Sequence, residues 1–383
     1  TLLPEIKVLR KALHQYPETA WNEKKTRLKL LETLKDCSIS LHKPYIETDL
    51  VFDMGKNKSK EALLLRSDMD ALSQLESGDK PYKSQNPGAA HNCGHDGHMS
   101  MLTGCALLLD KMIKRGFPLP RPVRFVFQPA EEIECGGAKL SSLGIMDGVD
   151  SVLAIHGWPS LAKGQLFSKE GPFFAAAATL VVTIEGEATH GALPENGQSP
   201  FPAAALLIEE IQKIQAEYAG RAVISLCRIN GGSSDNIIPR LIELRGTIRY
   251  FESSLLDEIK KRFTLASQKI QELSFCRVET DYISKYYLPL KNNKSFLHDL
   301  SEVLAEESQQ YKEIPSSIKD TDKKTVSEDF AFYTEKKPGA MVLLGLGDDT
   351  PPLHSSDFDF PDDVLIRGIL LFTVAAYQLK KRG

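Results

Sequence analysis

The 383-residue sequence has few cysteines, little net charge and no long apolar run. Its six cysteines are too sparse and unevenly spaced for a disulfide scaffold, which favours a reducing, cytoplasmic compartment. A formal net charge of -4 argues against nucleic acid as a main partner, because nucleic-acid-binding proteins usually carry a basic face. No apolar run reaches the length of a membrane span and no signal peptide is visible, so we expect no membrane association.

The first and last parts of the sequence alternate between helical and strand-like patterns. The apolar spacing predicts helices over residues 6–14, 26–34, 99–113 and 363–380. Short apolar runs predict buried strands over residues 62–65, 123–127, 152–155 and 340–344. Strands that alternate with helices favour an α/β fold, in which a mostly parallel sheet is covered by helices on both faces.

The middle of the sequence has a different order of elements. It predicts strands at 178–186, 222–229, 241–251 and 277–283, and helices at 202–217 and 255–273. The resulting order, β-α-β-β-α-β, is typical of a small ferredoxin-like domain. We therefore expect an α/β domain, residues 1–171 and 285–383, interrupted by an inserted α+β domain, residues 172–284.

Carboxylate or imidazole side chains follow four of the predicted strands. They are Asp68 and Asp70 after 62–65, Glu131 and Glu132 after 123–127, His156 after 152–155, and His354 beyond 340–344. In open α/β sheets, sites lie outside the carboxyl ends of the strands. Each residue alone has a common structural explanation, such as a helix cap or a buried histidine, but together they predict a functional site.

The segment HNCGHDGH, residues 91–98, places three histidines, one cysteine and one aspartate in eight residues. It leads into the helix predicted at 99–113, whose N-terminus favours a thiolate at Cys93. Thiolate, imidazole and carboxylate together suit zinc, cobalt or manganese. A structural zinc site normally has four ligands at short spacing, whereas these candidates are spread along the chain, as in catalytic sites.

A nucleophilic cysteine is the alternative interpretation of this segment. Cys93 beside His95 could serve a Cys–His hydrolase. Such a mechanism needs no adjacent glutamates on another strand, whereas a metal site uses Glu131 and Glu132 directly, one as ligand and one as base. The metal site is therefore the favoured interpretation.

These motifs resemble the amidohydrolase subfamily of peptidase family M20. The subfamily includes bacterial N-acetyldiaminopimelate deacetylases, hippurate and aminoacylase-type hydrolases, and plant hydrolases of auxin–amino acid conjugates. The resemblance covers nearly the whole chain, with motifs at residues 14–18, 66–72, 91–98, 127–132, 156–157, 186–194, 231–239, 246–249, 327–330 and 353–355. The segment containing Cys-Gly-His-Asp, followed by Pro-Ala-Glu-Glu at 129–132, is the most specific part.

The resemblance implies two divalent metal ions, with zinc, manganese and cobalt as candidates. Cys93 would bridge them, and the other implied ligands are His95, Glu132, His156 and His354. Glu131 would be the general base, and Asp70 would orient the site. The implied fold is a catalytic domain with an inserted lid, which often forms a homodimer through the lid.

As a mechanistic hypothesis, His190 of the inserted domain would stabilise the tetrahedral oxyanion, either in its own subunit or across a dimer. Asn236 and Arg249 are candidates for holding the substrate carboxylate, since the guanidinium donors form a planar fork. The expected activity is removal of the acyl group, in particular an acetyl group, from a small N-acyl amino acid. A metallo-dipeptidase or exopeptidase is an alternative.

A metal-binding homologue without catalysis is a further alternative, against which the intact Glu131 argues. The chain also departs from its relatives near the expected substrate. After Glu132 the chain reads Ile133-Glu134-Cys135-Gly136-Gly137, where relatives usually have a glycine-rich run, and Glu195 stands where many have histidine. These differences leave the identity of the acyl group and the amino acid open.

Overall fold

The computed structural model describes residues 2–55, 61–133 and 135–379, so Glu134 and residue 380 of the last predicted helix lie outside it. The chain divides into two compact units. Unit 1 comprises the residues up to Gly171, Lys291–Asp322 and those from Asp329 on. Unit 2 comprises Pro172–Leu290 and Lys323–Glu328.

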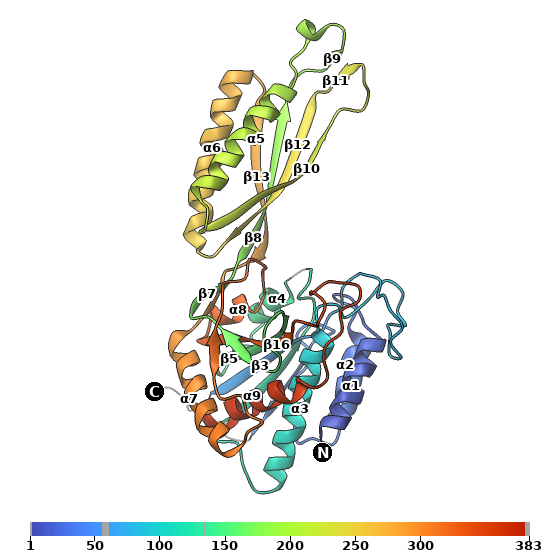
Figure 1. Ribbon diagram of the computed structural model, residues 1–383, viewed down its shortest axis with the longest axis vertical. Helices are drawn as coiled ribbons and strands as arrows, with labels where there is room; N and C mark the ends of the chain where they lie inside the picture. Colours follow the sequence, from blue (N-terminus) through green and yellow to red (C-terminus); the bar gives the residue numbers. More distant parts are fainter. Residues whose placement is uncertain (1, 56–60, 134, 380–383) are drawn as a thin grey trace. The chain divides into compact units, whose positions relative to one another are not determined.

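An eight-stranded sheet forms the centre of unit 1 (Figure 1). In spatial order its strands are β1 (Ser40–Leu41), β2 (Leu50–Met54), β4 (Val123–Gln128), β3 (Ala62–Asp68), β5 (Val149–Pro159), β16 (Gly339–Gly347), β6 (Leu166–Ser168) and β15 (Ile318–Asp320). The four central strands, β4, β3, β5 and β16, are parallel to one another. The expected mostly parallel sheet is therefore confirmed.

Both faces of this sheet are covered. All seven residues of β3 are buried, although successive side chains point to opposite faces. The helices of unit 1 are α1 (Leu3–Gln15), α2 (Lys24–Thr33), α3 (His95–Lys114), α4 (Gly136–Ser142), α7 (Lys294–Gln310), α8 (Ala331–Thr334) and α9 (Leu365–Gln378). Helix α3 packs against α1, α9 and β3, so the core fixes the position of the helix that carries His95.

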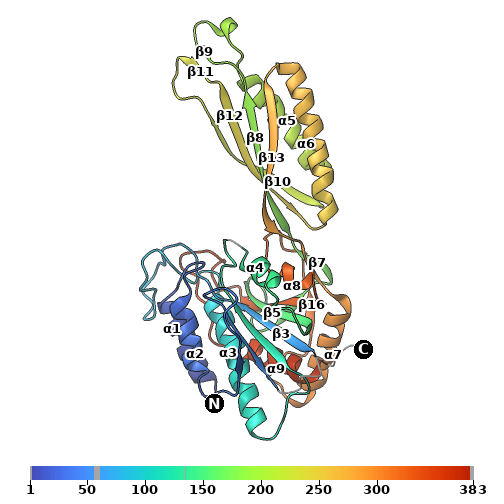
Figure 2. The same cartoon turned by 180° about the vertical axis from the view of Figure 1, so that it is seen from behind.

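Unit 2 is an antiparallel four-stranded sheet with two helices on one face (Figure 2). Its main elements are β8 (Ala176–Glu185), α5 (Phe201–Glu217), β10 (Ala222–Gly231), β12 (Leu241–Tyr250), α6 (Ser253–Ser274) and β13 (Arg277–Tyr287). The strand order β10-β12-β8-β13 is the ferredoxin-like arrangement expected from the sequence. Alternate residues of β8, including Leu180 and Val182, are buried in a core shared with both helices.

Four short strands and one 3-10 helix complete the structure. They are β7 (Gly171–Phe174), β9 (Thr189–His190), η1 (Pro194–Asn196), β11 (Ile237–Ile238) and β14 (Leu290–Asn292). The chain enters unit 2 within β7, leaves it at the start of β14, and returns to it for Lys323–Glu328. Strands β9 and β11 pair with each other, and Ile237 lies opposite His190.

Two elements that carry candidate ligands differ from the expected ranges. Strand β5 extends to Pro159, so His156 lies within the strand and not after it. Helix α3 begins at His95, four residues before the expected start at residue 99. Gly94 precedes it in the left-handed conformation, with φ of 87°, which a glycine adopts without strain.

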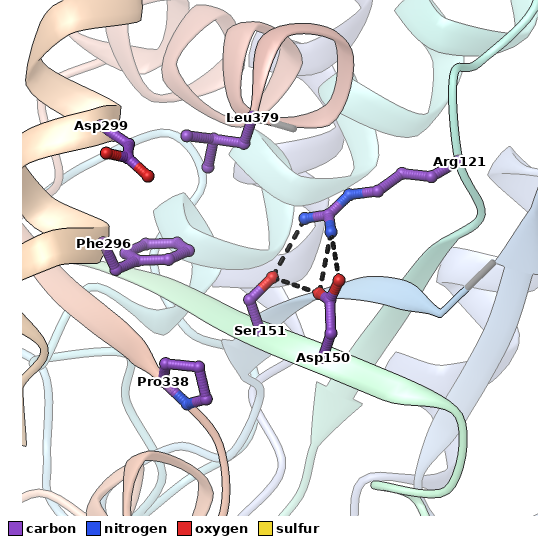
Figure 3. A pocket seen from close by; sticks show the side chains of 7 residues that line it. All are labelled: Arg121, Asp150, Ser151, Phe296, Asp299, Pro338 and Leu379. Carbon is purple, nitrogen blue, oxygen red and sulfur yellow. Dashed lines mark hydrogen bonds and ion pairs between the residues drawn. The ribbon is translucent and has the colours of Figure 1, made fainter. Parts of the chain in front are cut away.

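A cavity of about 170 Å³ lies at the amino ends of the parallel strands (Figure 3). Arg121, just before β4, donates to both carboxylate oxygens of Asp150 at 2.8 Å and to Ser151 at 3.0 Å, near the start of β5. The candidate site residues instead gather at the carboxyl ends of the strands. The hydrogen bonds from Arg121 to Asp150 therefore join the amino ends of β4 and β5, and these ends lie opposite the carboxyl ends that carry the candidate site.

Candidate metal centre

Two glycines allow the segment around Cys93 to pack against the loop that follows His354. A Cβ atom at Gly97 would lie 2.5 Å from the ring of Phe360, and one at Gly94 would lie 3.0 Å from it. The backbone N–H of His354 donates to the carbonyl of Asn92 at 2.7 Å. These contacts bring two segments that are distant in sequence to the same place.

The five predicted ligands come together in unit 1. Candidate ligand atoms of Cys93, Glu132 and His354 all lie within 4.8 Å of one another. Glu132 belongs to a second such group with His95 and Glu131. His156 joins the same cluster because its Nε2 lies 3.7 Å from the Cys93 Sγ.

The distances between these atoms fit shared metal ions. Two ligand atoms about 2.0–2.3 Å from one tetrahedral ion lie roughly 3.3–3.8 Å apart. Cys93 Sγ and His156 Nε2 are separated by 3.7 Å. Glu132 Oε1 lies 3.7 Å from His95 Nε2 and 3.5 Å from His354 Nε2. The side chains are thus spaced for metal ligation, with Glu132 between two histidines.

Backbone carbonyls orient two of the histidines. His95 donates through Nδ1 to the carbonyl of Asp70 at 2.9 Å, and His156 donates through Nδ1 to the carbonyl of Gly157 at 2.7 Å. The Nε2 of each ring is therefore the nitrogen left for a metal. Within the described ranges, the buried atoms His95 Nε2 and Glu132 Oε1 have no hydrogen-bond partner. Unpaired buried polar atoms are costly, and a bound cation between them removes that cost.

His98 lies among these residues but is not a suitable ligand. Its Nδ1 donates to Asp68 Oδ1 at 2.7 Å, and its Nε2 accepts the N–H of Gly157 at 2.8 Å. Asp68 also accepts from Arg66 at 2.9 Å. Both nitrogens of His98 are engaged, so His98 and Asp68 hold the start of α3 against β5. No partner of Asp68 was predicted from the sequence, and the ligand set implied by the family resemblance included His95 but not His98.

Asp70 holds the two glutamates. Its Oδ1 accepts from the backbone N–H of Glu131 and its Oδ2 from that of Glu132, both at 3.0 Å. Its own backbone carbonyl accepts from His95. One aspartate therefore fixes a candidate base and two candidate ligands.

The electrostatics of the cluster favour bound cations. Burial, reinforced by the carboxylates of Glu132 and Glu131, raises the pKa of the Cys93 thiol well above its usual range. Burial and the two carboxylates thus outweigh the effect of the helix N-terminus, which was expected to favour a thiolate at Cys93. A thiolate at Cys93 therefore requires a nearby cation. Burial and the neighbouring His98 lower the pKa of His156, which keeps its imidazole neutral, as a ligand must be.

Unit 2 brings His190 and Asn236 together on its exposed β9–β11 ribbon. The carbonyl of Asn236 accepts the N–H of Gly191 at 2.7 Å. The Nδ1 of His190 accepts the N–H of Ala192 at 3.1 Å, so the ring proton lies on Nε2. His190 therefore presents an exposed N–H donor, the group needed to bind an oxyanion.

Arg249 lies at the other end of unit 2. Leu241, at the start of β12, pairs with Glu185 near the β9–β11 ribbon, whereas Arg249 pairs with Ala177. Eight residues of strand at about 3.3 Å each separate Leu241 from Arg249 by roughly 26 Å. Arg249 donates to Ser327 at 2.7 Å. Unit 2 therefore does not bring Arg249 next to Asn236, although both were predicted to hold one substrate carboxylate.

No helix within the described ranges is long and apolar enough to cross a membrane.

Comparisons with known proteins agree with the observed fold and with the family resemblance of the sequence. The model of peptidase family M20/M25/M40 matches residues 64–378. An N-acetyl-L-cysteine deacetylase of Bacillus subtilis (strain 168) is 31% identical over 382 residues, covering 99% of this chain and 89% of the relative. An N-acetyldiaminopimelate deacetylase of Lacticaseibacillus casei is 30% identical, covering 94% of each chain. A crystal structure from Bacillus subtilis, described as a dinuclear metal-binding peptidase of the M20 family, is 27% identical with a TM-score of 0.84 and 98% coverage of both chains.

Proposed function

The chain belongs to peptidase family M20/M25/M40, as its motifs indicated, and we propose that it removes the acyl group from small N-acyl amino acids. One observation carries the proposal: five side chains converge around two buried atoms that have no hydrogen-bond partner in the described part of the chain. The five are Cys93, His95, Glu132, His156 and His354. The relatives named as deacetylases support an acetyl group as the acyl group. The products are a carboxylate and a free amino acid.

We propose that the five converging side chains hold two divalent cations, for which zinc, manganese and cobalt are candidates. The mixed thiolate, imidazole and carboxylate ligand set suits these metals. The family resemblance implies Cys93 as the bridge, and its position beside candidate ligand atoms of Glu132, His354 and His156 supports that role. When bound, such cations polarise an amide carbonyl and lower the pKa of water.

Glu131 is the candidate general base. It is 7% exposed, it neighbours the ligand Glu132, and its carboxylate lies within 4.8 Å of ligand atoms of His95 and Glu132. Asp70 fixes its backbone. In this position Glu131 takes a proton from water and passes it to the leaving amine.

Unit 2 supplies the remaining groups in this proposal. Its end carrying Arg249 is where the chain enters and leaves the unit. His190 and Asn236 belong to the opposite end, beyond Leu241, which is itself roughly 26 Å from Arg249 along β12. One small substrate cannot contact all three in a single chain. We propose a homodimer that pairs through unit 2, in which His190 and Asn236 of one copy and Arg249 of the other serve the same substrate.

A cytoplasmic location is consistent with the cysteines, because all six are free thiols. The competing activity is that of a dipeptidase or exopeptidase, since the same site can cleave a peptide bond. The structural relative described as a peptidase keeps that alternative open.

A substrate screen separates these activities. The metal-free protein is reconstituted with zinc, manganese or cobalt and assayed on N-acetyl amino acids and on matched dipeptides. The proposal expects kcat/KM to be higher for the N-acetyl compounds. A clear preference for dipeptides would assign an exopeptidase, and no turnover of either class with any metal would favour a non-catalytic homologue.

A further inference from the structure

Three successive backbone N–H groups after β4 are held by buried carboxylates from elsewhere in the chain. Glu131 and Glu132 donate to the two oxygens of Asp70. The preceding residue, Ala130, donates its N–H to Oε1 of Glu23 at 3.0 Å. Glu23 lies 107 positions earlier, just before α2. The loop that carries the candidate base therefore has a second anchor besides Asp70.

The loop needs such an anchor because its backbone is constrained. Ala130 has a φ of 56°, in the left-handed region that residues with a Cβ rarely adopt. The carbonyl of Ala130 accepts the N–H of Gly136 at 2.9 Å, and a Cβ at Gly136 would meet the Pro129 carbonyl oxygen at 1.8 Å. Surrounding contacts must hold such a conformation. The hydrogen bond from Ala130 to Glu23 acts at the strained residue itself.

The segment around Glu23 also contacts the far end of this loop. Lys139 of α4 places its Nζ 4.7 Å from the centre of the Trp21 ring. Glu23 itself is completely buried, and its second oxygen, Oε2, has no hydrogen-bond partner among the residues that the structure describes. A buried carboxylate is costly to maintain unless polar groups stabilise it. The side chain of Thr48 contributes to this, and the hydrogen bond from Ala130 is the contact that joins Glu23 to the glutamate loop.

We propose that Glu23 is a positioning residue that acts through Ala130 to hold Glu131 and Glu132 in their working geometry, an inference that rests on the proposed function. Glu23 is not a member of the candidate ligand groups found among the described residues. Removing its carboxylate frees the N–H of Ala130, which lets the left-handed turn relax. Relaxation moves the base Glu131 together with the ligand Glu132, so turnover and metal geometry change together.

The experiment compares three variants of the full chain. Glu23→Ala removes the acceptor, whereas Glu23→Gln keeps an oxygen for the Ala130 N–H. Glu18→Ala is the matched control, because Glu18 accepts from the backbone N–H of Thr26 at 2.8 Å in the same part of the chain without contacting the glutamate loop. Each protein is measured for kcat and KM at saturating metal, for the visible spectrum of its cobalt-loaded form, and for its melting temperature.

For Glu23→Ala we expect kcat to fall about 10–100-fold, the usual effect of losing a group that orients a metal site, with KM changed less than about threefold. Its cobalt spectrum should shift. Glu23→Gln should retain both the spectrum and kcat to within about threefold, and Glu18→Ala should lose only thermal stability. Wild-type kcat and spectrum in Glu23→Ala would overturn the proposal, even if its melting temperature fell.

The cobalt spectrum separates this inference from the proposed function. If the wild-type protein hydrolyses no N-acyl amino acid, the proposed function fails. The positioning role still stands in that case if Glu23→Ala alone shifts the spectrum. It falls if Glu18→Ala shifts the spectrum equally or if Glu23→Gln does not restore it.

Discussion

Replacing Asp70 by asparagine tests how the two glutamates are held. Asparagine presents one oxygen and one NH2 group in place of two acceptor oxygens. The backbone N–H groups of Glu131 and Glu132 each donate to a separate oxygen of Asp70 at 3.0 Å. In Asp70→Asn, at least one of these N–H groups must therefore face a donor.

The size of the effect follows from that lost contact. A hydrogen bond to a charged group contributes about 1.5–3 kcal/mol. At about 1.4 kcal/mol per factor of ten, this corresponds to roughly 10–150-fold. The loss should be divided between metal affinity and kcat, because Glu132 is a candidate ligand and Glu131 the candidate base.

The assay measures metal affinity by calorimetric titration and kcat at saturating metal, both against wild type. Asp110→Asn is a suitable control, because buried Asp110 accepts the N–H of Ser38 at 2.9 Å near the opposite end of α3 from His95. It should lower stability and leave kcat intact. Wild-type affinity and kcat in Asp70→Asn would refute the role assigned to Asp70.

Four other changes test separate parts of the account. Glu131→Gln should keep the metal content and lower kcat about 10²–10⁴-fold, and full activity would remove Glu131 as the base. Cys93→Ala should lose metal by elemental analysis, and full metal with full activity would disprove the bridging role. His190→Ala mixed with Glu131→Gln should regain activity through hybrid dimers, whereas no recovery in mixtures shown to exchange subunits would argue against a shared site. Despite burial, carboxylate partners raise the pKa of His14 from 6.5 to about 9, so its stabilising effect is complete below 6.5 and lost as the pH rises through 9. The unfolding free energy of metal-free protein should therefore fall over this window more than that of His14→Gln, and equal slopes would contradict the assignment.

Apolar runs were sufficient to predict the central strands of unit 1, because buried parallel strands are nearly continuous in hydrophobic residues. The antiparallel strands of unit 2 were also predicted, although strands such as β8 bury mainly alternate residues. The short strands at the sheet edges, such as β1 (Ser40–Leu41) and β15 (Ile318–Asp320), were missed. They are too short and too exposed to leave a pattern. The start of α3 was placed late, because the polar residues after Gly94 do not resemble an amphipathic helix.

The candidate ligands could be found from the sequence because their residue types are chemically specific and they stand at the ends of apolar runs or at the start of an apolar helix. The contacts that hold these ligands in place could not be found from the sequence. The bond from Ala130 to Glu23 joins residues 107 positions apart, and nothing near Glu23 distinguishes it from an ordinary acidic residue before a helix. The placement of Arg249 away from Asn236 likewise depends on strand register, which the motifs do not encode.

Metal content together with turnover tests the central claim most directly. The purified protein is stripped with a chelator, reloaded with zinc, manganese or cobalt, and assayed on N-acetyl amino acids, with bound metal counted by elemental analysis. The account predicts no hydrolysis without metal and recovery as two ions bind per chain. Undiminished hydrolysis by the metal-free protein would contradict it.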